Sequence, residues 1–360
     1  MLSIISILIV YITTLNVIIL IALFIKRKNR VSVSKKENFI SVIVAFRNES
    51  FNLETLISSL SNQNYPVDKF EVILVDDFSE DDSFKLAQNL ISDKPNFRLI
   101  KNAFNPGKKN ALKTGIANAR GEILLFTDAD CIPKQNWIKS INDEFDENID
   151  LVYGYSPFVA EKSLVNYLAR YENLFTSILM TAFHNAGYPY MSYGRNLSYR
   201  KSLFEKLGGF EKIQKSLSGD DDLFLQLTLK HNANVKLIEN ADSIVFTKCA
   251  RNFKSYIRQK SRHISASKFY PIELKIILAL IYGGNISLNI FLVIAMITLD
   301  PFLLSFIFFN WVIKVLSINR ISSIIKVDYP FYIIPFAEFL YSLILIFSGV
   351  RSRLRIVNWK

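Results

Sequence analysis

Hydrophobic residues gather at the two ends of this chain, whereas the middle mixes short apolar runs with polar stretches. One apolar run covers residues 2–25, and three more cover residues 276–299, 301–318 and 329–350. A helix of about 20 apolar residues is long enough to cross the hydrocarbon core of a bilayer. The pattern predicts an N-terminal transmembrane anchor at 1–25 and a C-terminal transmembrane region at 276–350.

Basic residues follow the first run directly and orient it. The cluster has no acidic residue among its members, which are Lys26, Arg27, Lys28, Arg30, Lys35 and Lys36. Cytoplasmic flanks of membrane helices are enriched in Lys and Arg. We therefore expect the segment after residue 25 to lie in the cytoplasm. A cleaved signal peptide is the alternative, but its charges would precede the apolar run.

The C-terminal runs leave the number of crossings open. If all three cross, the basic tail at 351–360 lies outside, against the charge rule that orients the first run. One run could instead lie in the interface or re-enter the membrane. The middle run, interrupted by Lys314, is the first candidate, although its removal would place Arg320 and Lys326 outside.

Between residues 38 and 250, short β-branched runs alternate with stretches of helical periodicity. This alternation predicts an α/β fold with a largely parallel sheet covered by helices. The expected strands are 39–46, 71–75, 97–100 and 122–126, and the expected helices are 50–62, a segment from about residue 81, and 108–119.

Acidic residues follow two of these strands. Asp76 and Asp77 end the second strand, and Asp128-Ala129-Asp130 ends the fourth. Ligands of parallel sheets bind beyond the carboxyl ends of the strands. An Asp-x-Asp pair can direct two carboxylates at Mg²⁺ or Mn²⁺, which can then bridge the phosphates of a nucleotide diphosphate. Such aspartates are also typical of plain strand ends and helix caps.

Charge and cysteine content narrow the class of protein. Half of the residues are hydrophobic, and the net charge is +11. Because the basic residues stand beside the apolar runs, they indicate a membrane surface rather than a nucleic-acid partner. Cys131 and Cys249 form no disulfide framework, which suits a reducing compartment. His184 and His231 have no zinc-ligand spacing, and we expect His184 at the surface or in a loop.

Several motifs in the insert occur in an order that resembles the family 2 glycosyltransferases, inverting enzymes with the glycosyltransferase A fold, a Rossmann-like nucleotide-diphospho-sugar transferase domain. The matching segments lie at 41–49, 75–82, 106–112, 126–130, 194–200 and 207–210. The resemblance covers about residues 39–265. It implies a catalytic domain at 38–250.

The resemblance also implies roles for individual residues. Asp76 and Asp77 would bind the nucleotide base, and Lys108 or Lys109 the donor phosphates or ribose, unless these lysines are only a solvated helix start. Asp130 would bind the metal together with Asp128, which could instead contact the ribose or the donor sugar. In the segment 219–223, Asp221 is the preferred general base and Asp220 the second choice. Arg195 and Asn196 would lie on the acceptor side.

The segment 258–263 resembles the Gln-x-x-Arg-Trp motif of processive synthases and ceramide glucosyltransferases. Gln259 and Arg262 would then contact the donor, with the arginine on its diphosphate. His263 stands where the family has a tryptophan for the acceptor. The whole stretch 251–275 also has the character of an amphipathic helix at the membrane interface.

Together these features predict a membrane-bound, metal-dependent, inverting glycosyltransferase. It would move a hexosyl group from a nucleotide diphosphate sugar, with UDP-sugars favoured, to a lipid-linked or membrane-proximal acceptor in polysaccharide or glycolipid synthesis. We expect it in a bacterial inner membrane with the catalytic domain in the cytoplasm. The alternatives are a processive polysaccharide synthase and a non-catalytic, nucleotide-binding membrane scaffold.

Overall fold

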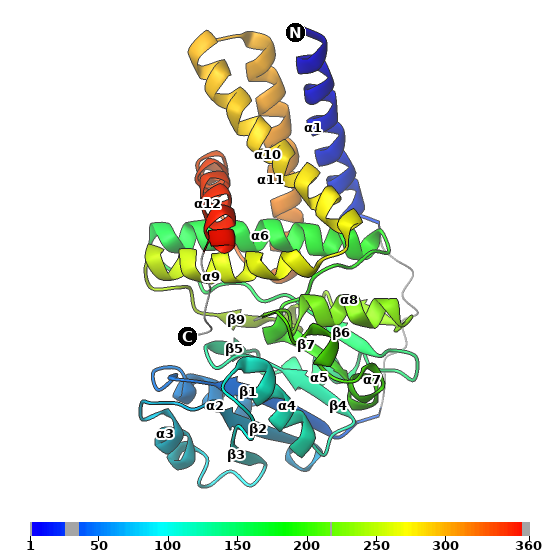
Figure 1. Ribbon diagram of the computed structural model, residues 1–360, viewed down its shortest axis with the longest axis vertical. Helices are drawn as coiled ribbons and strands as arrows, with labels where there is room; N and C mark the ends of the chain where they lie inside the picture. Colours follow the sequence, from blue (N-terminus) through cyan, green and yellow to red (C-terminus); the bar gives the residue numbers. More distant parts are fainter. Residues whose placement is uncertain (1, 26–35, 217, 355–360) are drawn as a thin grey trace. The chain divides into compact units, whose positions relative to one another are not determined.

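The computed structural model describes residues 2–25, 36–216 and 218–354 of the chain, with side chains described for most of them. The chain divides into two compact units (Figure 1). Among the described residues, the sheet unit comprises 36–159, 191–216 and 218–248, and the helical unit comprises 2–25, 160–190 and 249–354. The predicted basic cluster at 26–35 and the end of the basic tail lie outside the described residues.

A seven-stranded sheet with the order β3-β2-β1-β4-β7-β6-β8 is the centre of the sheet unit. Its strands are β1 (Ile40–Phe46), β2 (Phe70–Asp76), β3 (Phe97–Lys101), β4 (Ile123–Phe126), β6 (Leu151–Tyr153), β7 (Leu197–Arg200) and β8 (Val235–Leu237). The first four strands pair in parallel, and β7 is antiparallel to both of its neighbours. The predicted α/β fold and its four strands are confirmed. A small second sheet pairs β5 (Cys131–Pro133) with β9 (Val245–Thr247).

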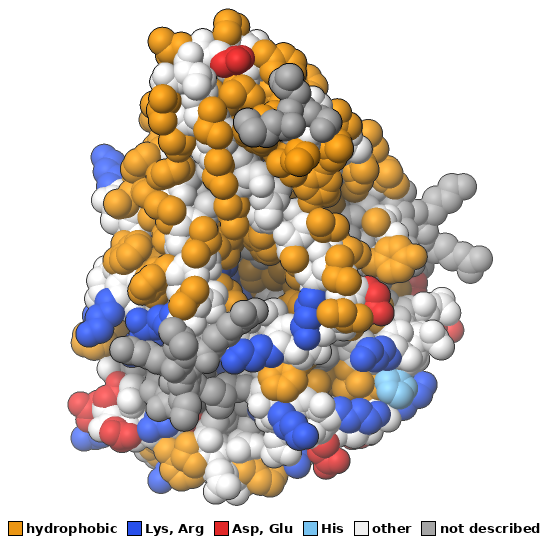
Figure 2. Space-filling view, turned by 45° about the horizontal axis from the view of Figure 1, so that its top comes forward, with side chains coloured by type: hydrophobic (Ala, Val, Ile, Leu, Met, Phe, Trp, Pro, Cys, Tyr) orange, Lys and Arg blue, Asp and Glu red, His pale blue; other side chains and the backbone are white. Residues whose placement is uncertain are grey.

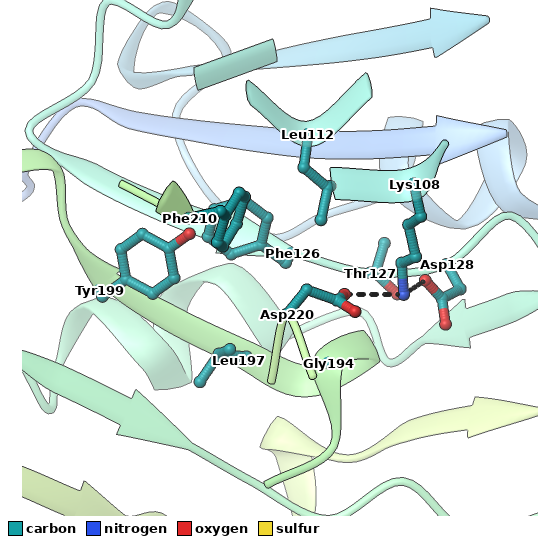
Figure 3. Close-up of a pocket in the computed structure, with 10 residues that line it drawn as sticks. All are labelled: Lys108, Leu112, Phe126, Thr127, Asp128, Gly194, Leu197, Tyr199, Phe210 and Asp220. Atoms are coloured by element: carbon teal, nitrogen blue, oxygen red, sulfur yellow. Dashed lines mark ion pairs between the residues drawn. The ribbon is translucent and has the colours of Figure 1, made fainter. Parts of the chain in front are cut away.

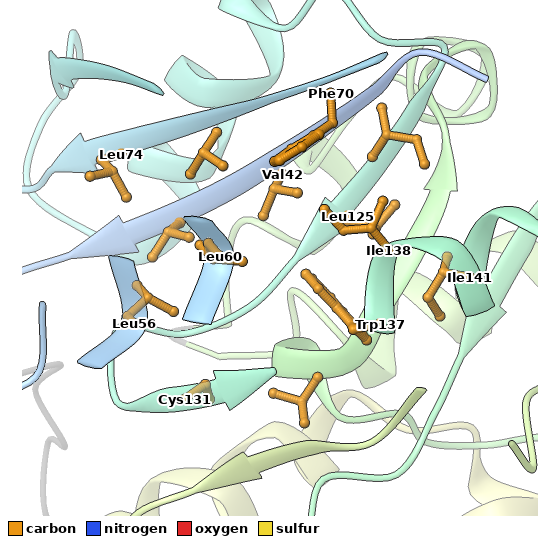
Figure 4. Close-up of a cluster of buried hydrophobic side chains, with 14 of the residues drawn as sticks. Val42, Leu56, Leu60, Phe70, Leu74, Leu125, Cys131, Trp137, Ile138 and Ile141 are labelled. Atoms are coloured by element: carbon orange, nitrogen blue, oxygen red, sulfur yellow. The ribbon is translucent and has the colours of Figure 1, made fainter. Parts of the chain in front are cut away.

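Helices cover the sheet where the sequence has helical periodicity. They are α2 (Leu53–Ser61), α3 (Ser83–Leu90), α4 (Lys108–Asn118), α5 (Trp137–Asn142), α7 (Lys201–Leu207) and α8 (Asp222–Lys230). Every residue of β1 and β2 is buried, as expected for Val- and Ile-rich strands with both faces covered. Figure 4 shows part of the core, in which Leu56 and Leu60 of α2 and Trp137 of α5 lie close to Val42 and Leu125 of the strands.

The helical unit is built from α1 (Leu2–Ala22), α6 (Leu164–Asn185), α9 (Phe253–Ala266), α10 (Ile272–Thr298), α11 (Pro301–Ile325) and α12 (Ile334–Leu354). Four segments are long and apolar enough to cross a membrane: 4–22, 272–298, 301–325 and 331–352. Many of their large side chains are exposed, and Figure 2 shows hydrophobic side chains over most of the upper part of the view, with Lys and Arg side chains gathered beneath them.

Helix α6 is the main departure from the domain boundaries expected from sequence. It lies within the range 38–250 but groups with the apolar helices, so the sheet unit is not one continuous segment. His184 is buried in this helix, at 2% exposure, and the expectation of a surface or loop position is wrong.

The two charges that interrupt the C-terminal apolar runs pair with each other. Lys314 of α11 forms an ion pair with Glu338 of α12, and its ammonium also donates to the side-chain oxygen of Asn285 at 2.7 Å. A buried charge is costly unless it is paired. The middle run is therefore part of a full-length helix whose lysine is neutralised by its neighbour.

Candidate active site

Asp128 and Asp130 lie on the turn that joins β4 to β5. The amide of Cys131 donates to the carbonyl oxygen of Asp128 at 3.2 Å, and the amide of Lys248 donates to that of Asp130 at 3.3 Å. These bonds between backbone groups hold the conformation of the turn. The turn therefore lies at the carboxyl end of a central strand, as the sequence predicts.

Lys108, the first residue of α4, connects this turn to α8. Its ammonium lies 2.8 Å from a carboxylate oxygen of Asp128 and 3.1 Å from one of Asp220 (Figure 3). Burial alone would lower the pKa of Lys108, but the two carboxylates outweigh it and raise that pKa. Lys108 thus connects the start of α4, the Asp128–Asp130 turn and the start of α8, which are far apart in the sequence. The alternative that Lys108 only begins a helix in solvent is wrong.

These residues lie around a small pocket. Its lining combines the ionic residues with apolar side chains from α4, β4 and β7: Lys108, Leu112, Phe126, Thr127, Asp128, Gly194, Leu197, Tyr199, Phe210 and Asp220. The rings of Phe126 and Tyr199 stack with centroids 4.7 Å apart. The pocket therefore has a charged side, formed by Lys108, Asp128 and Asp220, and an aromatic side.

The Asp130 carboxyl lies in a more enclosed environment. Burial raises its pKa, and the nearby charge of Asp128 adds to the increase, while Arg195 opposes it. A divalent cation between Asp128 and Asp130 would relieve this repulsion. The described residues contain no group of three His, Cys, Asp or Glu side chains that could hold a metal. Mg²⁺ and Mn²⁺ sites that are completed by substrate phosphates and water need only one or two carboxylates, so this pair fits such an ion.

Asp221 occupies the N-cap of α8. Its carboxylate accepts hydrogen bonds from the amide of Asp222 at 2.8 Å and from the amide of Gly194 at 3.2 Å. Burial raises its pKa well above the usual range, and the charges of Asp222 and Asp220 act in the same direction. Asp220 forms an ion pair with the Lys108 ammonium, whereas the hydrogen bonds of Asp221 come from backbone amides.

Asp77, at the end of β2, is enclosed by its own loop. Its side chain is fully buried and accepts hydrogen bonds from the amide group of Asn102 at 2.6 Å and from the backbone of Gly107 at 2.9 Å. Gly107 has φ +147°, a conformation that favours glycine, and it immediately precedes Lys108. Asp77 therefore positions the loop that presents Lys108. Asp76 is also buried and accepts from the amide of Ser79.

Lys109 points to a different part of the sheet unit. Its ammonium donates to the carbonyl oxygens of Ile213 and Ser216, both at 2.6 Å. These bonds tie α4 to the segment before α8. Lys109 is thus neither solvated nor directed into the pocket, and Lys108 alone of the predicted pair lines it.

Arg195 and Asn196 begin the segment that leads into β7. The Arg195 guanidinium donates to the hydroxyl of Ser156 at 2.7 Å. The Asn196 amide group donates to two backbone carbonyls, and its oxygen accepts from the indole of Trp137 at 2.9 Å. Asn196 is 1% exposed, and these contacts hold the segment that leads into β7, while the acceptor-side roles of Arg195 and Asn196 stay predictions.

Part of this site lies in a segment that is similar to a known family. Residues 41–208 match the family model of glycosyl transferase family 2. This segment contains β1 to β4, Lys108 and the Asp128–Asp130 turn, whereas Asp220 and Asp221 follow it in the chain.

Curated relatives and a solved structure agree with this match. Glycosyltransferase AglE of Haloferax volcanii is 32% identical over 121 residues, which are 33% of this chain and 40% of that protein. Probable glycosyltransferase YdaM of Bacillus subtilis is 24% identical over 245 residues, 65% of this chain and 56% of that protein. The chain thus spans about half the length of these relatives. The mannosyltransferase PcManGT from Pyrobaculum calidifontis was solved in complex with GDP-Man and Mn²⁺. Its structure aligns with 96% of this chain and 98% of the mannosyltransferase chain, with a TM-score of 0.60 and 18% sequence identity. This similarity indicates a shared fold.

Three predicted site residues lie outside the sheet unit. Gln259, Arg262 and His263 belong to α9 in the helical unit, and their roles toward the donor and acceptor stay predictions.

The sequence did not reveal two features of the pocket. One is the bridge from Lys108 to Asp220, and the other is the aromatic side formed by Phe126, Tyr199 and Phe210. Phe210 belongs to the Gly-Gly-Phe turn that resembles the family pattern, which is the only sequence signal for it. The bridge depends on a contact between residues 112 positions apart, which no local motif encodes.

Proposed function

We propose that this chain is a membrane-bound inverting glycosyltransferase that takes a sugar from a nucleotide diphosphate donor. The observation that carries the proposal is the convergence of Lys108, Asp128 and Asp220 on one pocket beside a buried Asp130. The match to glycosyl transferase family 2 supports the reaction class. The GDP-Man bound to the structurally similar mannosyltransferase supports the donor class, and UDP-sugars remain the donors favoured by sequence.

A divalent cation fits the carboxylates of Asp128 and Asp130. Mg²⁺ or Mn²⁺ held there would stabilise the negative charge of the departing diphosphate. Mn²⁺ in the mannosyltransferase complex supports this choice. Lys108 already neutralises Asp128 in the protein alone, and the same ammonium is placed to contact the donor phosphates once they arrive.

Asp221 is the general base in this proposal. Inversion needs a group that removes the proton of the attacking acceptor hydroxyl as the new glycosidic bond forms. The raised pKa of Asp221 makes its carboxylate a better proton acceptor than an ordinary aspartate. Asp220 is less suited, because its carboxylate is held by the Lys108 ammonium. The two backbone amides that bond Asp221 keep it in place while the proton moves.

The acceptor is membrane-proximal or lipid-linked in this proposal, since four segments have the length and composition of membrane spans. The basic residues after α1 orient the sheet unit toward the cytoplasm by the positive-inside rule. The polymerising alternative would need a channel through which its product crosses the membrane. This chain offers few C-terminal helices to build one.

The test is release of nucleoside diphosphate by the purified full chain, measured with UDP-, GDP- and dTDP-sugars in the presence of Mn²⁺ or Mg²⁺. We expect one donor class to react, and we expect Asp130→Asn to abolish the reaction. Asp93→Asn is a matched control, because the Asp93 side chain is 78% exposed. Equal rates for the wild type and Asp130→Asn would contradict the proposal.

A further inference from the structure

Helices α6 and α9 form a polar layer in the helical unit. They pack against each other through Glu172 of α6, which bonds both Tyr256 and Lys260 of α9. Helix α9 also carries the exposed basic residues Lys254 and Arg258. Neither helix has the composition of a membrane span among the described residues. A helix with as many charged residues as α9 is unstable in the hydrocarbon core of a membrane, so we expect this polar layer to lie at the level of the lipid headgroups.

Helix α12 is apolar enough to span a membrane, yet it contacts this layer along its whole length. Before the helix, the Tyr329 hydroxyl donates to a carbonyl oxygen of α6 at 3.2 Å. In its middle, the Tyr341 hydroxyl accepts from Lys260 at 3.1 Å. In its last turns, the carbonyl oxygen of Ser352 accepts at 3.1 Å from Lys268, which directly follows α9. Figure 1 shows α6 and α9 side by side, with the end of α12 beside them.

These contacts are incompatible with a crossing. A helix of 21 residues is about 30 Å long, close to the thickness of the hydrocarbon core. If α12 crossed, one of its ends would lie on the far side, away from the polar layer. We propose that α12 lies along the membrane surface on the side of the polar layer, and that α1, α10 and α11 are the three crossing helices. This rests on the proposed membrane anchoring of the chain.

The two faces of α12 suit this position. One face is polar and buried against the protein, with Glu338, Tyr341, Ser342, Ser348 and Ser352. The other face is apolar and exposed, with Phe336, Leu343, Phe347 and Val350. These four residues fall on one stripe of the helix at intervals of seven, four and three. The stripe is available to lipid acyl chains, while the buried face bonds to α9, α10 and α11.

The distribution of charge agrees. The link between α10 and α11 consists of Leu299 and Asp300 and has no basic residue. Lys268 and Lys275 lie near the beginning of α10, and Arg320 and Lys326 lie near the end of α11. The positive-inside rule then places the link outside and the other ends in the cytoplasm.

The proposal also removes the conflict found in the sequence. With α12 on the surface, the basic tail at 351–360 stays on the same side as the cluster at 26–36. The helix that does not cross is then the last apolar run, rather than the middle run that the sequence analysis favoured. Helix α11 keeps its buried Lys314 because Glu338 of α12 neutralises it.

Cysteine labelling in intact cells tests the topology. In the full chain with Cys131→Ala and Cys249→Ala, single cysteines are introduced as Leu299→Cys, Lys326→Cys and Lys360→Cys and treated with a membrane-impermeant maleimide. We expect only Leu299→Cys to be labelled before the cells are permeabilised, and all three afterwards. Labelling of Lys360→Cys in intact cells would overturn the proposal. Extraction of the protein from membranes by alkaline carbonate would instead overturn the membrane anchoring itself.

Depth measurements test the orientation of α12 directly. Nitroxide labels at Phe336→Cys, Leu343→Cys and Val350→Cys, in protein reconstituted into vesicles of anionic and zwitterionic lipid, report depth through collision with oxygen and with a water-soluble nickel complex. A helix in the surface gives three similar depths. A crossing helix would separate the first and last labels by about 20 Å along the membrane normal, and that result would overturn the proposal. Labels at Ile7→Cys and Val10→Cys on α1 provide the contrasting profile of a crossing helix.

Discussion

Two aspartate pairs follow parallel strands of the same sheet, and the protein treats them in opposite ways. Asp77 is enclosed, and its carboxylate is occupied by the side chain of Asn102 and the backbone of Gly107. Asp128 faces a pocket, and its carboxylate is 31% exposed beside the Lys108 ammonium. The same residue type at the ends of two strands thus holds a loop in one place and lines a pocket in the other.

Asp77 and Asp128 differ in the groups that bond their carboxylates, and not in the strands that they follow. Neutral donors from a neighbouring loop satisfy Asp77 permanently, because those donors cannot be displaced without opening the loop. The Lys108 ammonium pairs with Asp128 at the pocket, where we expect an arriving cation or phosphate to be able to replace one of the partners. We therefore expect the metal and phosphate chemistry at Asp128 and Asp130, while the predicted contact of Asp76 and Asp77 with the nucleotide base stays a prediction.

Asp130→Asn is the strongest way to test this contrast. Loss of one carboxylate removes half of the proposed cation site while the side chain keeps its size. Since a bound metal contributes several kcal/mol to the stabilisation of a departing diphosphate, we expect the rate of sugar transfer to fall about a thousandfold. The thermal stability without ligand should be unchanged or higher, because burial raises the pKa of this carboxyl. Steady-state rates and melting curves with and without Mn²⁺ measure both effects, and a normal rate would refute the assignment.

Asp221→Asn should be the next most damaging change. Removal of a general base typically lowers a rate by about a hundredfold or more. The amides of Gly194 and Asp222 bond different oxygens of Asp221, and the asparagine keeps only one acceptor, so we expect a modest loss of stability in a protein that still folds. Donor binding, followed by calorimetry, should be unaffected. Asp220→Asn is the matched comparison, and we expect it to weaken donor binding through Lys108. If Asp220→Asn alone abolished transfer, the base would be the wrong aspartate.

The sequence predicted the first four strands, the helices between them and the resemblance to a family, because each follows from local periodicity or a short motif. The run Ile40–Phe46 is buried on both faces, as its composition indicates. The position of α6 could not be predicted, since its helical pattern does not reveal which unit it packs against. The contacts of Asp77 could not be predicted either, because Asn102 and Gly107 are 25 and 30 residues away, and the motif at 106–112 does not reveal that its loop folds back onto this carboxylate.

Asp77→Asn tests the enclosed side of the comparison. In this variant an NH2 group replaces one carboxylate oxygen. This donor then faces another donor, either the backbone N–H of Gly107 or the side-chain NH2 of Asn102. An unsatisfied buried donor costs about 1–3 kcal/mol, so the free energy of unfolding should fall by that amount. The effect on transfer should be smaller than that of Asp130→Asn by about an order of magnitude or more, since the loop still presents Lys108. Urea denaturation and rate measurements on the same samples separate the two effects. A complete loss of nucleotide binding with full stability would show that Asp77 contacts the base directly.

Lys109→Met has the smallest expected effect and sharpens the contrast between two adjacent lysines. Lys109 donates to the carbonyl oxygens of Ile213 and Ser216, and burial lowers the pKa of its ammonium despite the aspartates nearby. A hydrogen bond from a charged group is worth about 1.5–3 kcal/mol, but the thioether chain of methionine keeps much of the packing, so we expect a net loss of about 1–2 kcal/mol of stability.

The rate of transfer by Lys109→Met at saturating donor should stay within about threefold of the wild type, because the bonds of Lys109 position the backbone before α8 without reaching the pocket. Lys108→Met should instead raise the donor concentration needed for half-maximal rate, since it removes the ammonium that faces Asp128 and Asp220. Equal kinetic losses in both variants would mean that exchangeable and fixed counter-charges contribute alike, and the distinction between the two aspartate pairs would then fail.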